Sequence, residues 1–228
     1  MTAEKTEQEL FVPTKTSEKT TDVEVATETE LSVVTGKHSS EVIQAIFNLH
    51  FPTVSRVLDM TYGKGNFWKW PYRFSLTGAD IAHDKGGLQA DSRRLPFDDA
   101  SFDVAVIDPP FMHGATANGY SSTVGLNRDF SRLCSQAVVL TLYKALLQEA
   151  YRLVSVGVVV KCKDIIESGK FAHMSAKVSA ALEEVGFVLD DKVVFVPDIV
   201  LARDPRWKQW HFRRQESYFL IGRKKANP

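Results

Sequence analysis

The chain has 228 residues, 44% of them hydrophobic, and a formal net charge of zero, which suits one compact domain with a tail. Cys134 and Cys162 lie far apart and the six histidines are scattered, so we expect no disulfide framework and no metal site. The sequence contains no apolar run of the length that a secretion signal or a membrane span requires, so we expect a cytoplasmic protein without membrane contact. Because the total charge is balanced, the net charge does not indicate nucleic-acid binding, and a surface that binds nucleic acid must be identified from local clusters of basic residues.

Residues 1–33 are expected to form a disordered acidic tail, and residues 34–228 the folded domain. The first 30 residues hold eight acidic and three basic residues, and they contain almost no aromatic side chains. Such a composition cannot bury a core.

A short apolar strand is predicted at Val57-Leu58-Asp59, followed by the turn Met60-Thr61-Tyr62-Gly63-Lys64-Gly65 and then by a helix. Glycines in such a turn let the backbone approach a ligand closely. A dinucleotide fingerprint would need a third small residue where this chain has Trp68, which disfavours a dehydrogenase. A nucleoside ligand without phosphates fits this turn better.

Two further acids follow the next predicted strands. Asp80 ends the run 74–80 and lies 21 residues after Asp59, about the offset at which an acid meets ribose hydroxyls. A turn or a helix cap is the alternative role for Asp80, and both remain open. Asp91 follows the third predicted strand, where it could accept a hydrogen bond from an adenine amino group.

The most informative motif is Ile107-Asp108-Pro109-Pro110-Phe111, which follows a buried parallel strand predicted over residues 102–106. At a strand's carboxyl end, Asp108 could accept one hydrogen of a nucleobase amino group and a prolyl-segment carbonyl the other, while Phe111 stacks on the base. Asp and Pro are also ordinary turn residues, so the tripeptide alone remains weak support.

After this motif the pattern predicts a long loop over 111–129, a helix through Leu142–Leu153, a strand at 156–160 and a helix that ends at Gly186. Strands at 192–196 and 217–221 are expected to form a closing antiparallel pair. The expected fold is therefore α/β, a Rossmann-like sheet of seven mostly parallel strands with helices on both faces.

A basic and aromatic segment lies between those last two strands. Residues 198–228 contain eight Lys or Arg and three Asp or Glu. Cations interleaved with aromatic rings suit a phosphate backbone and unstacked bases. The alternative interpretation of this segment is a solvated hairpin. The candidate nucleic-acid contacts are Arg203, Arg206, Trp207, Lys208, Trp210, Arg213 and Arg214.

A second basic segment, Lys161-Cys162-Lys163-Asp164, lies at the end of the strand predicted at 156–160. It could contact a substrate phosphate or simply end that strand in water.

Together these motifs resemble the class I S-adenosylmethionine-dependent methyltransferases over most of residues 35–225. Within that class they resemble the amino-methyltransferases that carry an Asp-Pro-Pro-aromatic motif and modify exocyclic nitrogens of DNA or RNA bases. The resemblance implies S-adenosylmethionine as cofactor and a catalytic motif formed by Asp108, Pro109, Pro110 and Phe111. The implied cofactor contacts are Lys37, His38, Asp59, Thr61, Gly63, Gly65, Asp80, Asp91, Ser92 and Asp108.

The chain departs from this family in the first motif, which commonly reads Asp-Pro-Phe-x-Gly-x-Gly and here reads Asp-Met-Thr-Tyr-Gly-Lys-Gly. The roles of Met60 and Tyr62 are therefore open. The expected reaction is methylation of adenine-N6 in DNA, because family members with Asp at the position of Asp108 more often act on adenine. The alternatives are an RNA adenine amino-methyltransferase, a DNA cytosine-N4 methyltransferase, and a non-catalytic subunit that binds cofactor or nucleic acid. No target-recognition domain fits between the motifs, so recognition must come from loops or from a partner.

Overall fold

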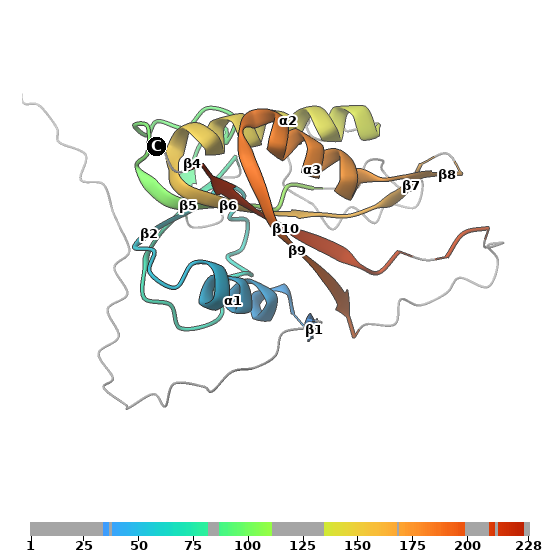
Figure 1. The fold of residues 1–228 in the computed structure, drawn as a ribbon, viewed down its shortest axis with the longest axis horizontal. Coiled ribbons are helices and arrows are strands. Elements are labelled where there is room, and N and C mark those ends of the chain that lie inside the picture. The colour runs from blue at the N-terminus through green and yellow to red at the C-terminus, as the bar shows by residue number, and fades with distance from the viewer. Residues whose placement is uncertain are drawn as a thin grey trace, which may run out of the picture. The chain divides into compact units, whose positions relative to one another are not determined.

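One large sheet dominates the computed structural model, which describes residues 34–36, 38–81, 87–110, 135–167, 169–198, 210–212 and 214–225. Its eight strands run in the order β1-β9-β10-β6-β5-β2-β3-β4 (Figure 1). Only β10 is antiparallel to its two neighbours, and all other pairs are parallel. The strands are β1 (Val34–Gly36), β2 (Arg56–Asp59), β3 (Ser75–Asp80), β4 (Leu88–Gln89), β5 (Phe102–Ile107), β6 (Val154–Cys162), β9 (Phe187–Pro197) and β10 (Ser217–Lys224). The predicted class, the seven mostly parallel strands and the antiparallel closing pair are confirmed, and β1 adds a short edge strand.

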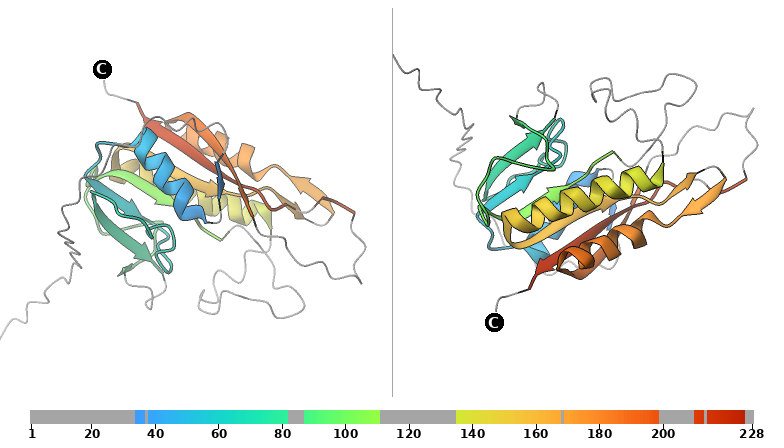
Figure 2. Two further views of the ribbon diagram at one scale, coloured as in Figure 1. Left: turned by 90° about the horizontal axis from the view of Figure 1, so that it is seen from below. Right: turned by 90° about the horizontal axis from the view of Figure 1, so that it is seen from above.

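Helices cover both faces of the sheet, as predicted. Helix α1 (Ser39–His50) packs on one face, and α2 (Gln136–Leu153) and α3 (Met174–Val185) pack on the other (Figure 2). Alternate residues of β5 enter the two cores, with Val104 and Val106 on the α1 side and Ala105 and Ile107 on the α2 side. A strand buried on both faces must be apolar throughout, which is why this run was recognisable in the sequence.

Helix ends follow local chemistry. Gly186 ends α3 in the left-handed conformation at φ 117°, as the sequence predicted, and its N–H bonds to Leu182 and Glu183 carbonyls. Ser135 caps α2 by accepting from the Val138 N–H at 3.4 Å. Helix α1 was not predicted, although Val42, Ile43, Ile46 and Phe47 supply its buried face.

The helix predicted after the glycine turn is wrong: residues 60–74 form turns and irregular backbone. The indole N–H of Trp68 bonds to the buried carboxylate of Asp59 at 2.7 Å, and this contact folds the segment back on the end of β2. Pro71 lacks the N–H that a helix interior requires. Instead of a helix, the segment supplies rings to an aromatic cluster formed by Phe47, Trp68, Trp70, Tyr72 and Phe74.

A small hairpin, β7 (Ile165–Glu167) and β8 (Lys170–Ala172), was also missed. It stands apart from the large sheet and pairs only with itself (Figure 1). Three-residue strands carry too little alternation to be seen in a sequence.

The acidic residues 1–33, the loop 111–129 and Cys134 lie outside the described residues, so those predictions stay untested. Cys162 is a buried free thiol. Among the described helices none combines the length and apolar character that crossing a membrane requires.

Candidate active site

Three aspartates gather at the carboxyl ends of neighbouring parallel strands. Asp59 ends β2, Asp80 ends β3, and Asp108 directly follows β5. Because β2 lies between β3 and β5, Asp59 lies between the other two carboxylates; burial is the main cause that raises its pKa, and both carboxylates add to it. This edge of an open α/β sheet is where ligands bind.

Asp59 is the most buried of the three, with 2% of its surface exposed. Its Oδ1 accepts from the Thr61 N–H at 2.9 Å, and its Oδ2 accepts from Trp68 Nε1 at 2.7 Å. Burial raises its pKa to about 7, against the lowering effect of these two hydrogen bonds. Both carboxylate oxygens of Asp59 thus bind groups of the protein, Thr61 and Trp68, and Asp59 thereby fixes the turn that follows β2.

The glycine turn is fastened to the next strand by Asp80, whose Oδ2 accepts from the Gly63 N–H at 2.8 Å. Gly63 and Gly65 have φ values of 50° and 65°, a region that other residues rarely adopt. Tyr62 fills the space beside the turn: a Cβ on Gly65 would lie 2.7 Å from its hydroxyl, and one on Gly78 2.6 Å from its ring. Tyr62 therefore packs between the glycine turn and β3, while Met60 is fully buried in the core.

The two predicted contacts after the third strand have partners within the chain. Asp91 binds Arg93 through both carboxylate oxygens, with contacts of 2.5–3.0 Å. The Arg93 hydrogen bonds lower the pKa of Asp91. The Ser92 hydroxyl donates to the Met60 carbonyl, which ties this loop to the end of β2. The structure thus brings Asp91 and Ser92 to the same strand edge as the other acids.

Asp108 is held by its backbone and presents its side chain to a cavity. Its N–H donates to the Thr61 hydroxyl at 2.7 Å, and its Oδ2 accepts from Lys161 Nζ at 3.3 Å. Its Oδ1 is buried and has no hydrogen-bond partner among the described residues. Burial raises the pKa of Asp108, and the ion pair with Lys161 opposes that effect.

The cavity beside Asp108 has a volume of about 510 Å³. Its charged lining consists of Asp108, Lys69, Lys161 and Lys163. Burial and the neighbouring Lys161 lower the pKa of Lys163, while Glu216 raises it. The remaining lining residues are His38, Ser39, Asn66, Phe67, Phe195, Pro197, Gln215 and Ser217. Of the residues that line the cavity, the sequence analysis named Asp108 and His38 as site residues and left the role of Lys161 and Lys163 open. It assigned no site role to the others.

The segment before β10 lies against the β7–β8 hairpin. His211 Nε2 contacts the Gly169 carbonyl at 2.9 Å, and the Arg214 guanidinium lies 4.5 Å from the centre of the Phe171 ring. Trp210 and Phe212 are 76% and 86% exposed. Arg203, Arg206, Trp207, Lys208 and Arg213 lie outside the described residues, as do Lys37 and Phe111.

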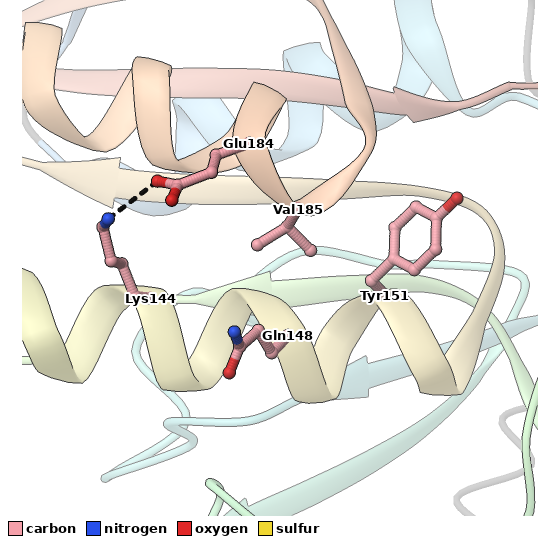
Figure 3. A pocket seen from close by; sticks show the side chains of 5 residues that line it. All are labelled: Lys144, Gln148, Tyr151, Glu184 and Val185. Atoms are coloured by element: carbon pink, nitrogen blue, oxygen red, sulfur yellow. Dashed lines mark hydrogen bonds and ion pairs between the residues drawn. The ribbon is translucent and has the colours of Figure 1, made fainter.

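A second hollow of about 380 Å³ lies between α2 and α3 and is lined by Lys144, Gln148, Tyr151, Glu184 and Val185 (Figure 3). Lys144 and Glu184 form an ion pair of 2.7 Å across it. None of the strand-end residues lines this hollow. In the described part of the chain, no group of histidine, cysteine and acidic residues has the arrangement of a metal site.

No family model and no curated protein matches the chain. Solved structures match it at low identity. A 1,6-didemethyltoxoflavin-N1-methyltransferase from Burkholderia thailandensis, with S-adenosylhomocysteine bound, is 14% identical over 83% of this chain and 80% of its own, with a TM-score of 0.50. Magnesium protoporphyrin IX methyltransferase from Synechocystis PCC 6803, also with S-adenosylhomocysteine, is 12% identical over 82% and 81%, with the same TM-score.

TrmN from Thermus thermophilus is 17% identical over 82% of this chain and 49% of its own, at a TM-score of 0.50. The chain spans only 54% of a second Thermus thermophilus protein, provisionally assigned as a DNA modification methylase, at 16% identity and a TM-score of 0.39. These likenesses concern the fold. The chain has the Rossmann-like fold of class I methyltransferases, with the strand order and the antiparallel closing strand described above.

Proposed function

We propose that this protein is an S-adenosylmethionine-dependent methyltransferase that modifies an exocyclic amino group of a nucleobase, adenine-N6 in DNA. The observation that carries the proposal is Asp108 Oδ1, a buried carboxylate oxygen without a hydrogen-bond partner among the described residues, beside a cavity at the carboxyl end of β5. An unpaired buried acceptor is costly unless a ligand supplies the donor.

The strand-end residues fit the cofactor. Asp59 and Asp80 place two acidic groups at this edge of the sheet, which suits a ligand that carries a sulfonium and an ammonium group. Gly63 and Gly65 expose backbone close to that edge, and Asp80 fixes their conformation. When bound, S-adenosylmethionine supplies the methyl group for transfer.

Asp108 would orient the amine of the substrate. An exocyclic amine is a weak nucleophile because its lone pair is shared with the ring. Oδ1 of Asp108 can accept one amine hydrogen, and a carbonyl of the Asp108–Pro110 segment can accept the other. Pro109 and Pro110 bring no N–H donors that would compete for these acceptors. The amine lone pair is then left free for the electrophile, and positioning supplies most of the acceleration.

Asp108 does not remove a proton from the neutral amine, because a carboxylate is far too weak a base. Proton loss follows methylation, when the nitrogen carries the positive charge. Oδ1 already accepts a hydrogen bond from that nitrogen, so it is placed to receive the proton. Stacking of the base on Phe111 remains a prediction, since Phe111 lies outside the described residues.

Two features support a nucleic-acid substrate. Three lysines line the cavity beside Asp108, and a cationic surface attracts phosphates. Trp210 and Phe212 present exposed rings on which unstacked bases can lie. The base must leave its duplex or be offered in a single strand to reach Asp108. The choice of adenine rests on the family preference for Asp at this motif position.

The test is to offer purified full-length protein and isotopically labelled S-adenosylmethionine to DNA and RNA separately, in single- and double-stranded form. Nucleosides are then analysed by mass spectrometry, with Asp108→Ala as the matched inactive control. Labelled N6-methyladenine in DNA is the expected product.

Other products would revise the proposal in defined ways. N4-methylcytosine would reassign the base, and N6-methyladenine in RNA alone would reassign the nucleic acid. Cofactor binding without product on any substrate would favour the non-catalytic subunit.

A further inference from the structure

Lys161 stands beside Asp108 because of the register of two parallel strands. Ile107 of β5 pairs with Val160 of β6, so the residues that follow them, Asp108 and Lys161, emerge together at the sheet edge. Lys161 Nζ lies 3.3 Å from Asp108 Oδ2, and only 13% of the lysine side chain is exposed.

The ammonium of Lys161 is confined on several sides. It lies 5.3 Å from the centre of the Phe67 ring and 5.8 Å from that of Phe219, distances at which a cation is attracted to an aromatic face. The Lys161 carbonyl accepts from the Tyr143 hydroxyl at 2.8 Å, which fixes the backbone below it. These contacts restrict the positions that the ammonium can take.

Lys161 is also the cation that balances Asp108. In the described part of the chain the other titratable groups that act on Asp108, or are acted on by it, are Asp59 from β2, Tyr143 from α2 and Cys162 from β6. None of these is a cation. Lys69 and Lys163 also line the cavity, but within the described residues the ion pair with Asp108 is that of Lys161. A buried carboxylate without a cation becomes protonated.

Resting on the proposed function, we infer that Lys161 is a positioning residue for Asp108: its ammonium occupies Oδ2 and leaves Oδ1 as the acceptor for the substrate amine. A protonated Asp108 would be a weaker acceptor, and its O–H would be a donor, which an amine hydrogen cannot use. The ion pair therefore selects both the charge of Asp108 and the oxygen that meets the substrate.

The primary test does not depend on activity. Carboxyl-¹³C aspartate is incorporated into full-length protein, and the Asp108 resonance, assigned with Asp108→Asn, is titrated by NMR. We expect Lys161→Met to raise the Asp108 midpoint by about 1 to 3 pH units. Lys161→Arg, which keeps a cation, should titrate close to wild type.

Lys224→Met is the matched control. Lys224 also lies on a strand, with its ammonium 4.5 Å from the centre of the Tyr151 ring and bound to two carbonyls, but it is at the far end of β10. In Lys224→Met, the midpoint of the Asp108 titration should equal that of wild type. An unchanged midpoint in Lys161→Met would overturn the inference, and Lys161→Gln gives the same readout should the Met variant fail to fold.

Kinetics form a second arm once a substrate is known. The acid limb of the kcat profile should move to higher pH in Lys161→Met, by the shift that NMR measures, with the KM for cofactor unchanged. An acid limb that stays in place while the midpoint moves would contradict the positioning role. A moved midpoint in a protein that methylates neither DNA nor RNA would leave the ion pair standing and refute the proposed function.

Discussion

The backbone N–H of Asp108 donates a hydrogen bond of 2.7 Å to the side-chain hydroxyl of Thr61. This bond joins the loop after β5 to the glycine turn after β2, two segments that are 47 residues apart in the chain. The residue proposed to orient the amine and the turn proposed to hold the cofactor are thus fixed to each other directly.

Thr61→Val should separate these two segments while keeping the shape of the side chain. Loss of the acceptor leaves a partly buried N–H unpaired, so we expect a cost of about 1 kcal/mol in the free energy of unfolding. Turnover should fall by a larger factor than stability suggests, because small displacements of a positioning group are costly. Thr61→Ser keeps the hydroxyl and serves as control. Equal turnover in both variants would argue against the coupling.

Asp108→Ala should abolish methyl transfer and leave cofactor affinity within a few fold. Asp108 is proposed to meet the substrate amine, whereas Asp80 and the glycine turn are proposed to meet the cofactor. Calorimetric titration with S-adenosylhomocysteine, beside the nucleoside assay, separates the two effects. A parallel loss of both would mean that these roles cannot be divided.

Trp68→Phe should destabilise the protein more than Trp70→Phe. Trp68 Nε1 donates to the buried Asp59 carboxylate at 2.7 Å, whereas Trp70 Nε1 donates to the Phe67 carbonyl at 2.9 Å. Hydrogen bonds to charged groups contribute more than neutral ones, so above pH 7, where Asp59 is ionised, we expect about 2 kcal/mol for Trp68 and about 1 kcal/mol for Trp70. Urea unfolding measures both. Equal costs would show that ring packing, and not the carboxylate, determines the effect.

Asp59 should make the free energy of unfolding fall as pH rises from about 4 to 7. In the folded protein its pKa is raised to about 7, mainly by burial, from an ordinary value of 3.8. Between these values the folded state retains a proton that the unfolded chain has lost, so each pH unit removes at most about 1.4 kcal/mol. This stabilisation is complete below pH 3.8 and is lost as pH passes 7. Asp59→Asn should show a flatter curve across this window.

The control for that experiment is Asp190, whose pKa shift has the opposite sign to that of Asp59. A hydrogen bond from Arg223 Nε lowers the pKa of Asp190, so the contribution of Asp190 to stability is present at neutral pH and is lost only as pH falls through that lowered value. Asp190→Asn should therefore differ from wild type in acid and share its slope between pH 4 and 7. Parallel curves for wild type and Asp59→Asn in that window would show that Asp59 does not titrate there.

Replacing Trp210 and Phe212 by alanine should weaken nucleic-acid binding without altering its salt dependence. Stacking contributes about 1 to 3 kcal/mol per base and releases no counterions. Arg214→Gln should instead reduce the slope of log K against log salt by about one, if its guanidinium contacts a phosphate. Leu49→Ala, at another exposed apolar side chain, is the control. Fluorescence anisotropy over a range of salt concentrations distinguishes these cases.

The sheet could be predicted because its central strands are buried on both faces. Val104 to Ile107 had to be apolar without interruption, and Asp59, Asp80 and Asp108 marked the strand ends at which polar residues begin. Gly186 likewise indicated the end of α3. Each of these signals is local in the sequence.

The parts that could not be predicted depend on contacts between distant residues. The proximity of Lys161 and Asp108 requires the register of β5 and β6, and residue spacing does not reveal it. The helix expected after the glycine turn is absent because Trp68 bonds to Asp59 and joins the aromatic cluster. The packing role of Tyr62 depends on Gly65, which lies near its hydroxyl, and on Gly78, which lies near the other end of its ring.

The position of β10 has a consequence for synthesis of the chain. Residues 217–224 pair with both β6 and β9, yet they are translated after both. While the chain is being made, β6 and β9 therefore emerge with unpaired edges and without Phe219, Leu220 and Ile221, which complete the cores on the two faces. Open strand edges invite pairing with other chains. The arrangement of β10 between β6 and β9 can therefore form only after β10 has been synthesised, and a chain that ends before residue 217 keeps both of these strand edges open.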